Sequence, residues 1–124
     1  MSARVLVVED ETMVLLFASM VLEDEGYEVL EATDGRKGLE TARQGSVDVI
    51  VTDFMMPVMD GMAMLRALRA EGCAVPVVVT SAVPRAQLNA GDLAIAAYLR
   101  KPYDEETLAG AVREALDAEG EPTG

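Results

Sequence analysis

The sequence is poor in the residues that bind transition metals or form disulfides. It has no histidine and a single cysteine, Cys73, among 124 residues. An internal disulfide is therefore impossible, and a zinc site built from cysteine and histidine is excluded. We interpret this composition as typical of a reduced, cytoplasmic protein.

Basic residues and long apolar runs are also scarce. There are 10 lysines and arginines against 22 acidic residues, which gives a net charge of −12. Such a chain repels nucleic-acid phosphates and anionic lipid headgroups, so we expect no direct binding to nucleic acid. No signal peptide precedes the first apolar run, and no run approaches the roughly 20 residues that cross a bilayer, so we expect no membrane association.

Short valine-rich runs alternate with longer segments of helical period. This alternation predicts an α/β fold in which helices on both faces cover a five-stranded parallel sheet. The most polar run, the second, is expected at an edge of the sheet. The predicted strands are Val5–Val8, Glu28–Ala32, Val47–Thr52, Val75–Thr80 and Ala96–Leu99.

Each predicted strand is followed by a predicted helix. Asp34, Asp60 and Asp104 suit helix N-caps, and glycines suit the ends of the first three helices. We expect one domain over residues 1–118 and a flexible tail over 119–124. The predicted helices run from about Glu11 to Glu25, from after Asp34 to Gly45, from Asp60 to Gly72, from Arg85 to Ala90 and from Glu105 to Ala118.

Carboxylates follow two of the predicted strands. Glu9 and Asp10 come directly after the first strand, and Asp53 comes after the third. Ligands of such sheets bind beyond the carboxyl ends of the strands, so we expect these acids to converge there. Crowded carboxylates repel one another unless a cation lies among them. Oxygen ligands without histidine or cysteine select Mg²⁺ or Ca²⁺, and two or three carboxylates with waters suit Mg²⁺.

A simpler reading exists for most of these acids. Glu9 and Asp10 could cap the following helix, and Asp60 is best explained as a cap. Asp53 is different, because an ionised group at the end of a buried strand costs on the order of several kcal/mol unless it is paired or metal-bound. Lys101, at the end of the fifth strand, is the predicted partner of Asp53.

Four segments of the chain resemble the receiver domain of bacterial two-component response regulators, in the order of that family and near its spacing. The resemblance covers nearly the whole chain and implies a flavodoxin-like (βα)5 fold with strand order 2-1-3-4-5. The segments are Val7-Val-Glu-Asp-Glu11, Asp53-Phe-Met-Met-Pro-Val-Met-Asp-Gly61, Pro76-Val-Val-Val-Thr-Ser-Ala82 and Tyr98-Leu-Arg-Lys-Pro-Tyr103.

The resemblance implies that Asp53 accepts a phosphoryl group from a phosphohistidine on a histidine kinase or histidine phosphotransfer protein. Asp10 would then bind Mg²⁺ directly, Glu9 would bind it through water or at the margin, and the backbone carbonyl of Met55 would be a further ligand. Lys101 would hold a phosphoryl oxygen. The resemblance also implies that the domain promotes only its own phosphorylation and dephosphorylation and is not an enzyme that turns over other substrates.

Further expectations from the resemblance concern the switch. The Ser81 hydroxyl would bind the last phosphoryl oxygen, although Thr80 competes for this role. Tyr98 is expected to follow that hydroxyl inward on phosphorylation, and the Lys101–Pro102 peptide bond is expected to be cis.

Hydrolysis of the acyl phosphate is expected to be slow. The two positions that usually decide its rate in the family are Met55 and Val83 here, and neither side chain can hydrogen-bond an attacking water.

Two features depart from the family. The segment from Ser81 to Lys101 is slightly shorter than usual in the family. The sequence therefore does not decide which surface passes the signal on, and we expect a monomer or weak homodimer. The first helix has an inward apolar stripe and further apolar residues on its flanks, which form either a docking face for the partner or a broad buried stripe. The stripe comprises Val14, Phe17, Ala18 and Val21, and the flanking residues are Leu15, Leu16 and Met20.

Rival functions share parts of this pattern. A Mg-dependent phosphatase of the haloacid-dehalogenase type places a second aspartate two residues after its nucleophile, where this chain has Met55. A flavodoxin-like electron carrier needs a hydroxyl- and glycine-rich loop after the first strand, which is missing here. A receiver-like protein-binding module that is never phosphorylated is the remaining alternative.

Overall fold

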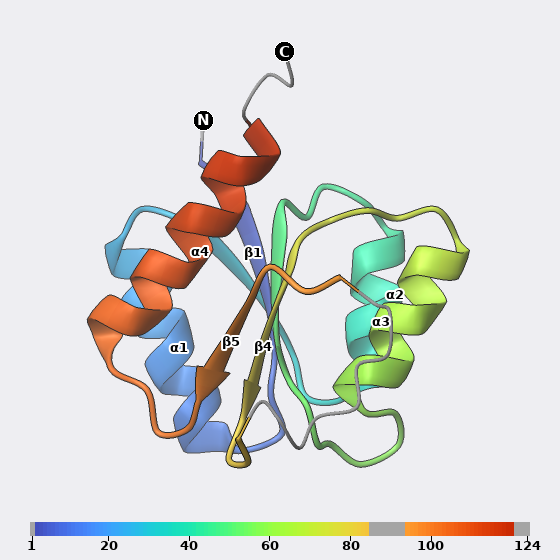
Figure 1. Cartoon of the computed structure of the whole chain (residues 1–124), viewed down its shortest axis with the longest axis horizontal. Coiled ribbons are helices and arrows are strands. Elements are labelled where there is room, and N and C mark those ends of the chain that lie inside the picture. The colour runs from blue at the N-terminus through green and yellow to red at the C-terminus, as the bar shows by residue number, and fades with distance from the viewer. Residues whose placement is uncertain (1, 85–93, 121–124) are drawn as a thin grey trace.

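The computed structural model describes residues 2–84 and 94–120, and it contains a five-stranded parallel sheet with helices on both faces (Figure 1). The predicted helix at Arg85–Ala90 lies outside the described residues. The strands are β1 (Arg4–Val8), β2 (Glu28–Ala32), β3 (Val49–Asp53), β4 (Val77–Ser81) and β5 (Ala97–Arg100). The helices are α1 (Thr12–Asp24), α2 (Gly35–Arg43), α3 (Gly61–Ala70) and α4 (Glu105–Gly120).

The strand order is β2-β1-β3-β4-β5, as the resemblance implied. Strands β3 and β4 lie inside the sheet and are buried along their whole length. Strand β2 lies at one edge, and its two glutamates, Glu28 and Glu31, are exposed to solvent. The polar character of this run therefore predicted its place correctly, because an edge strand buries less of its surface.

Two apolar clusters hold the helices against the sheet. One lies between the sheet and helices α1 and α4, and its centre includes Val7, Leu22 and Leu108. The other lies between the sheet and helices α2 and α3, and includes Ile50 and Leu65. Within the described residues, no helix is long and apolar enough to span a bilayer.

The three predicted N-caps and the glycines predicted to end the first three helices are confirmed. The side chains of Asp34, Asp60 and Asp104 each accept a hydrogen bond of 2.8 Å from a backbone N–H three residues later. Such bonds satisfy amides that the first helical turn leaves without partners. Gly26, Gly45 and Gly72, which follow α1, α2 and α3, have φ values of 95°, 81° and 84°, a conformation that favours glycine.

The boundaries of β2 were predicted as observed, and those of the other strands differ by one or two residues at one or both ends. Strands β3 and β4 continue one residue past the apolar run and include Asp53 and Ser81. The reason is that the ladder continues there, because the Phe54 N–H donates to the Thr80 carbonyl and the Lys101 N–H donates to the Ser81 carbonyl, each at 2.8 Å. The sheet thus carries its polar residues to its carboxyl edge.

The structure divides the flank of α1 between the two alternatives that the sequence left open. Leu15 is 7% exposed and belongs to the core beside α4, whereas Leu16 and Met20 are 48% and 64% exposed. Leu15 therefore cannot be part of a docking face. Helix α4 also extends to Gly120, two residues beyond the predicted helix end at Ala118, and residues 121–124 lie outside the described part.

Candidate functional site

Asp53 is the last residue of β3 and lies in the centre of the sheet edge. It is 7% exposed. The loop that follows folds back tightly, because the Gly61 N–H donates to the Phe54 carbonyl at 3.1 Å. A Cβ atom on Gly61 would collide with the Asp53 carbonyl oxygen, so only glycine fits at that position. Gly61 was not predicted as a site residue, although its place after the Asp60 cap was visible in the sequence.

Glu9 and Asp10 reach the same edge from β1. Carboxylate oxygens of Glu9, Asp10 and Asp53 all lie within 4.8 Å of one another. Glu9 is 3% exposed, whereas Asp10 is exposed to solvent. The structure therefore brings together the three acids that the sequence placed there, and this donor set of hard oxygen atoms fits a divalent cation such as Mg²⁺.

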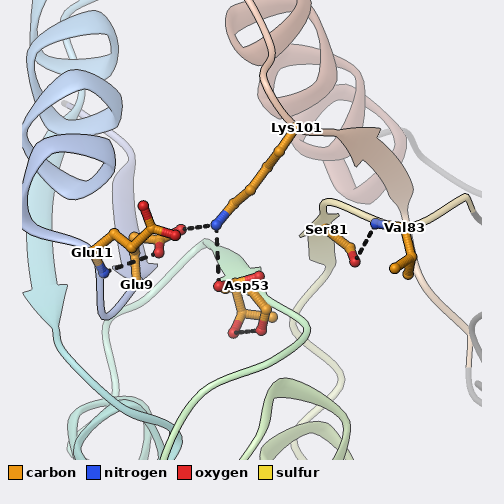
Figure 2. A network of polar contacts seen from close by, with 7 residues as sticks. Glu9, Glu11, Asp53, Ser81, Val83 and Lys101 are labelled. Carbon is orange, nitrogen blue, oxygen red and sulfur yellow. Dashed lines mark hydrogen bonds and ion pairs between the residues drawn. The ribbon is translucent and has the colours of Figure 1, made fainter.

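Lys101 extends between two of these acids (Figure 2). Its Nζ lies 2.9 Å from Oε1 of Glu9 and 3.1 Å from Oδ2 of Asp53. The contact with Asp53 was predicted, but the closer contact with Glu9 was not. The Lys101–Pro102 peptide bond is cis, which confirms the expectation for this turn.

The electrostatics of this group reflect two buried carboxylates that share one ammonium. Burial raises the pKa of Asp53 and of Glu9, and the hydrogen bonds from Lys101 only partly offset this effect. Burial lowers the pKa of Lys101, but the bonds to Glu9 and Asp53 outweigh burial and raise it. The surroundings therefore favour the charged form of Lys101 and disfavour the charged forms of Asp53 and Glu9, which a further cation would stabilise.

Strand β4 ends with two residues that carry hydroxyl groups, Thr80 and Ser81. Thr80 is the register partner of Asp53, and both Thr80 and Ser81 are 2% exposed. The Ser81 Oγ accepts a hydrogen bond from the Val83 N–H at 3.2 Å, and Figure 2 shows the Ser81 side chain turned toward Val83. The structure thus places both candidate hydroxyls at the site edge without choosing between them.

Tyr98 occupies β5, next to β4. Its ring packs against the cluster beneath α2 and α3. Its hydroxyl is buried and has no hydrogen-bond partner among the described residues.

An apolar groove opens beside Lys101. It has a volume of about 530 Å³ and lies between the start of α1 and the loops after β4 and β5. The aromatic rings of Phe17 and Tyr103 lie 6.1 Å apart in its wall, and burial raises the pKa of Tyr103 to about 12. The lining residues are Glu11, Met13, Val14, Phe17, Ala82, Lys101, Pro102 and Tyr103.

Known proteins share this fold and much of the sequence. The solved chemotaxis response regulator CheY4 of Vibrio cholerae has a TM-score of 0.87 and 32% identity, and the match covers 94% of this chain and 100% of that one. The receiver domain of the sensor histidine kinase PA1611 of Pseudomonas aeruginosa PAO1, solved with a magnesium ion coordinated in its active site cleft, has a TM-score of 0.85 and 25% identity over 94% of this chain and 99% of that one.

Sequence relatives are longer than this chain. The transcriptional regulatory protein PrrA of Mycobacterium tuberculosis is 39% identical over 121 residues, which cover 96% of this chain and 52% of PrrA. A probable transcriptional regulatory protein of Picosynechococcus is 36% identical over 123 residues, which cover 92% of this chain and 49% of the relative. The chain therefore spans about half the length of these relatives.

The family model of the response regulator receiver domain matches residues 5–113, which include every site residue described above. With its strand order and its edge of clustered acids, the chain belongs to the response regulator receiver domain family of two-component signalling.

Proposed function

We propose that Asp53 accepts a phosphoryl group from a phosphohistidine on a histidine kinase or a histidine phosphotransfer protein, with Mg²⁺ bound nearby. The observation that carries this proposal is the position of Lys101, whose Nζ lies 3.1 Å from Asp53 within the three-carboxylate cluster. A nucleophilic carboxylate needs such a cation beside it when a dianionic phosphoryl group approaches.

The reaction exchanges one bond to phosphorus for another. A carboxylate oxygen of Asp53 attacks the phosphorus and forms an acyl phosphate, while the phosphorus–nitrogen bond breaks and the imidazole nitrogen leaves with the electron pair. Lys101 neutralises charge that builds up on the phosphoryl oxygens. Positioning and charge neutralisation supply most of the rate in such transfers, and both are properties of this edge of the sheet.

The metal would be held by carboxylate oxygens of Asp10 and Asp53 and by the backbone carbonyl of Met55. Bound Mg²⁺ supplies positive charge that offsets the charge on the transferring phosphoryl group. The magnesium ion in the related PA1611 receiver supports this assignment. Asp10, as the exposed member of the cluster, is suited to a cation that keeps several waters.

Signal output would follow from a change at β4 and β5. Ser81 is the proposed ligand of the last phosphoryl oxygen, with Thr80 as the alternative. Movement of this hydroxyl toward the phosphoryl group would open space that Tyr98 can enter. The buried hydroxyl of Tyr98, which has no hydrogen-bond partner among the described residues, supports this proposal, because a second position with a partner would lower its energy.

The partner is proposed to dock on the exposed face of α1 and in the adjoining groove. Met13, Leu16 and Met20 project from this helix with 77%, 48% and 64% of their surface exposed. They lie at helical spacing, and Met13 also lines the groove beside Lys101. A helix of the phosphohistidine protein seated here would bring its imidazole to the phosphoacceptor edge.

Two other predictions stay predictions. A cytoplasmic location agrees with the single cysteine, and a monomer or weak homodimer is the expected oligomeric state. We also propose that the chain promotes only its own phosphorylation and dephosphorylation. Met55 at the second position after Asp53 supports this, because a thioether cannot act as the general acid of a phosphatase.

Intact-mass spectrometry with acetyl phosphate tests the phosphoacceptor role. We expect a phosphate-sized mass gain in the wild type that requires Mg²⁺, is abolished by EDTA and is lost in Asp53→Asn. Asp60→Asn is the matched control, because it changes a carboxylate in the same loop that only caps α3. No labelling of the wild type at saturating Mg²⁺ would instead favour a protein-binding module that is never phosphorylated.

A further inference from the structure

The loop between β3 and α3 carries three methionines, and only one of them is turned to solvent. Met55 is 66% exposed, whereas Met56 and Met59 are partly buried and pack against the apolar cluster beneath α2 and α3. Met62 and Met64, which follow on α3, are buried. Oxidation of a side-chain sulfur depends on its exposure, so Met55 is the thioether of this region that an oxidant can reach.

Met55 also lies next to the phosphoacceptor. It follows Asp53, the last residue of β3, by two positions. Burial raises the pKa of Asp53, and hydrogen bonds from Lys101 and from the Met55 backbone N–H act against that shift. The backbone of Met55 is therefore held at the Asp53 carboxylate, while its side chain extends into the solvent that would supply a hydrolysing water.

A thioether cannot orient such a water, but its oxidised form can. Methionine sulfur is only a weak hydrogen-bond acceptor, whereas oxidation to the sulfoxide makes the side chain polar. The oxygen of a sulfoxide at position 55 can accept a hydrogen bond from a water molecule and hold it for attack on the phosphorus of an acyl phosphate. The modification adds this acceptor without adding a charge.

We propose that Met55 is an oxidation site whose sulfoxide shortens the lifetime of the phosphorylated state. The inference rests on the proposed function, because it requires an acyl phosphate on Asp53. Hydrogen peroxide supplies the oxygen: a sulfur–oxygen bond forms, the oxygen–oxygen bond breaks, the sulfur loses two electrons and the peroxide is reduced to water. In the later hydrolysis the water oxygen bonds to phosphorus and the bond to the Asp53 oxygen breaks, which releases inorganic phosphate.

Other sulfur atoms of the chain must be separated from Met55. Met13 and Met20 on α1 are 77% and 64% exposed, so peroxide will oxidise them as well. They provide the matched control, because they are as accessible as Met55 but lie on a helix and not in the loop after Asp53. Cys73 is partly buried, and a thiol reductant reverses the first step of its oxidation.

The experiment compares three proteins before and after treatment with hydrogen peroxide. They are the wild type, Met55→Leu, and the double variant Met13→Leu with Met20→Leu. Peroxide is removed, a thiol reductant is added, and peptide mass mapping locates each added oxygen. The protein is then phosphorylated with acetyl phosphate and Mg²⁺, the donor is removed, and intact-mass spectrometry follows the decay. The quantity compared is the ratio of decay rates after and before oxidation within each protein, so differences between the unoxidised variants cancel.

In the wild type we expect Met55 to gain one oxygen before Met56 and Met62 do. The decay rate should then rise by about threefold or more, a small part of what a well-placed proton acceptor can contribute. The double variant on α1 should show the same rise, and Met55→Leu should show none. Met55→Gln, which carries a hydrogen-bond acceptor at this position without oxidation, should decay faster than Met55→Leu in the absence of peroxide.

Several results would overturn the inference. They are an unchanged decay rate in wild type with oxidised Met55, an equal rise in Met55→Leu, a Met55 that stays unoxidised while buried methionines gain oxygen, and loss of labelling that follows oxidation. An unoxidised wild type that acetyl phosphate cannot label refutes the phosphoacceptor role itself. A labelled wild type whose decay ignores Met55 refutes only the oxidation site, so the two failures are distinguishable.

Discussion

The two helical layers of this protein pack on the same sheet but carry opposite charge. Helices α1 and α4 have seven acidic residues and one arginine in their sequences, whereas α2 and α3 have five basic residues and one glutamate. The first set is Glu23, Asp24, Glu105, Glu106, Arg113, Glu114, Asp117 and Glu119. The second set is Arg36, Lys37, Glu40, Arg43, Arg66 and Arg69.

The layers also differ in what they expose. Three large apolar side chains of α1 are exposed, and in the described part of the chain α2 and α3 expose none. The junction of α2 and α3 is instead closed by a forked ion pair, in which the Arg43 Nε donates to Oε1 of Glu71 at 2.9 Å. In the described part of the chain, the layer of α2 and α3 thus exposes mainly basic side chains, whereas the layer of α1 and α4 exposes both acidic and large apolar side chains.

The most damaging change should come from the side of α1 that faces the core. We expect Leu15→Ala to lower the free energy of unfolding by about 2–5 kcal/mol, the usual range for a leucine removed from a packed interior. Leu16→Ala should change it by less than about 0.5 kcal/mol, as is typical of surface positions. Urea unfolding measures both. Similar losses for the two variants would show that Leu16 is also buried and would remove it from the docking face.

Replacing exposed apolar residues of α1 by arginine should mainly slow phosphotransfer from the partner protein. We expect Leu16→Arg with Met20→Arg to reduce the rate of transfer from the cognate phosphohistidine protein by about tenfold or more, because important interface side chains contribute more than about 1 kcal/mol each. Labelling by acetyl phosphate should be unchanged. The charge-matched control is Gln44→Arg with Ala70→Arg on the other layer, where both residues are exposed. If both double variants slow transfer equally, the two layers do not differ in docking.

The loops between the layers should set how long the signal lasts. Met55 is 66% exposed and Val83 is 36% exposed, and neither can orient an attacking water. We expect Met55→Asn with Val83→Glu to speed loss of the phosphoprotein several-fold, because a polar side chain near the acyl phosphate can position water. The decay is followed by mass spectrometry after removal of the donor. Unchanged or slower decay would mean that these side chains do not control hydrolysis.

The smallest expected effect concerns the ion pair between Arg43 of α2 and Glu71, which follows α3. The hydrogen bond from Arg43 lowers the pKa of Glu71. An acid with a lowered pKa in the folded state adds stability above its unfolded pKa and loses it as pH falls through the folded value. Arg43→Gln should therefore lower the melting temperature slightly at pH 7, and the difference should shrink in acid and vanish once the pH has fallen through the lowered pKa of Glu71. A difference that persists in acid would assign the effect to packing of the arginine stem.

Local sequence determined the elements of the fold and most members of the site. Valine-rich runs gave the strands, and Asp34, Asp60 and Asp104 marked the helix starts, because these features act between residues close in the chain. The contact of Asp53 with Lys101 was also predictable. A charged group at the end of a buried strand needs a partner, and the carboxyl ends of parallel strands meet at one edge.

Only the tertiary structure decided which surfaces were left exposed and which acid holds Lys101. Leu15 and Leu16 are adjacent in sequence and equally apolar, yet the rotation of α1 against α4 buries one and exposes the other. Glu9 and Asp10 are adjacent acids, but the end of β1 turns Glu9 toward Lys101 and leaves Asp10 in solvent. Composition cannot separate such neighbours, because their environments depend on where distant segments pack.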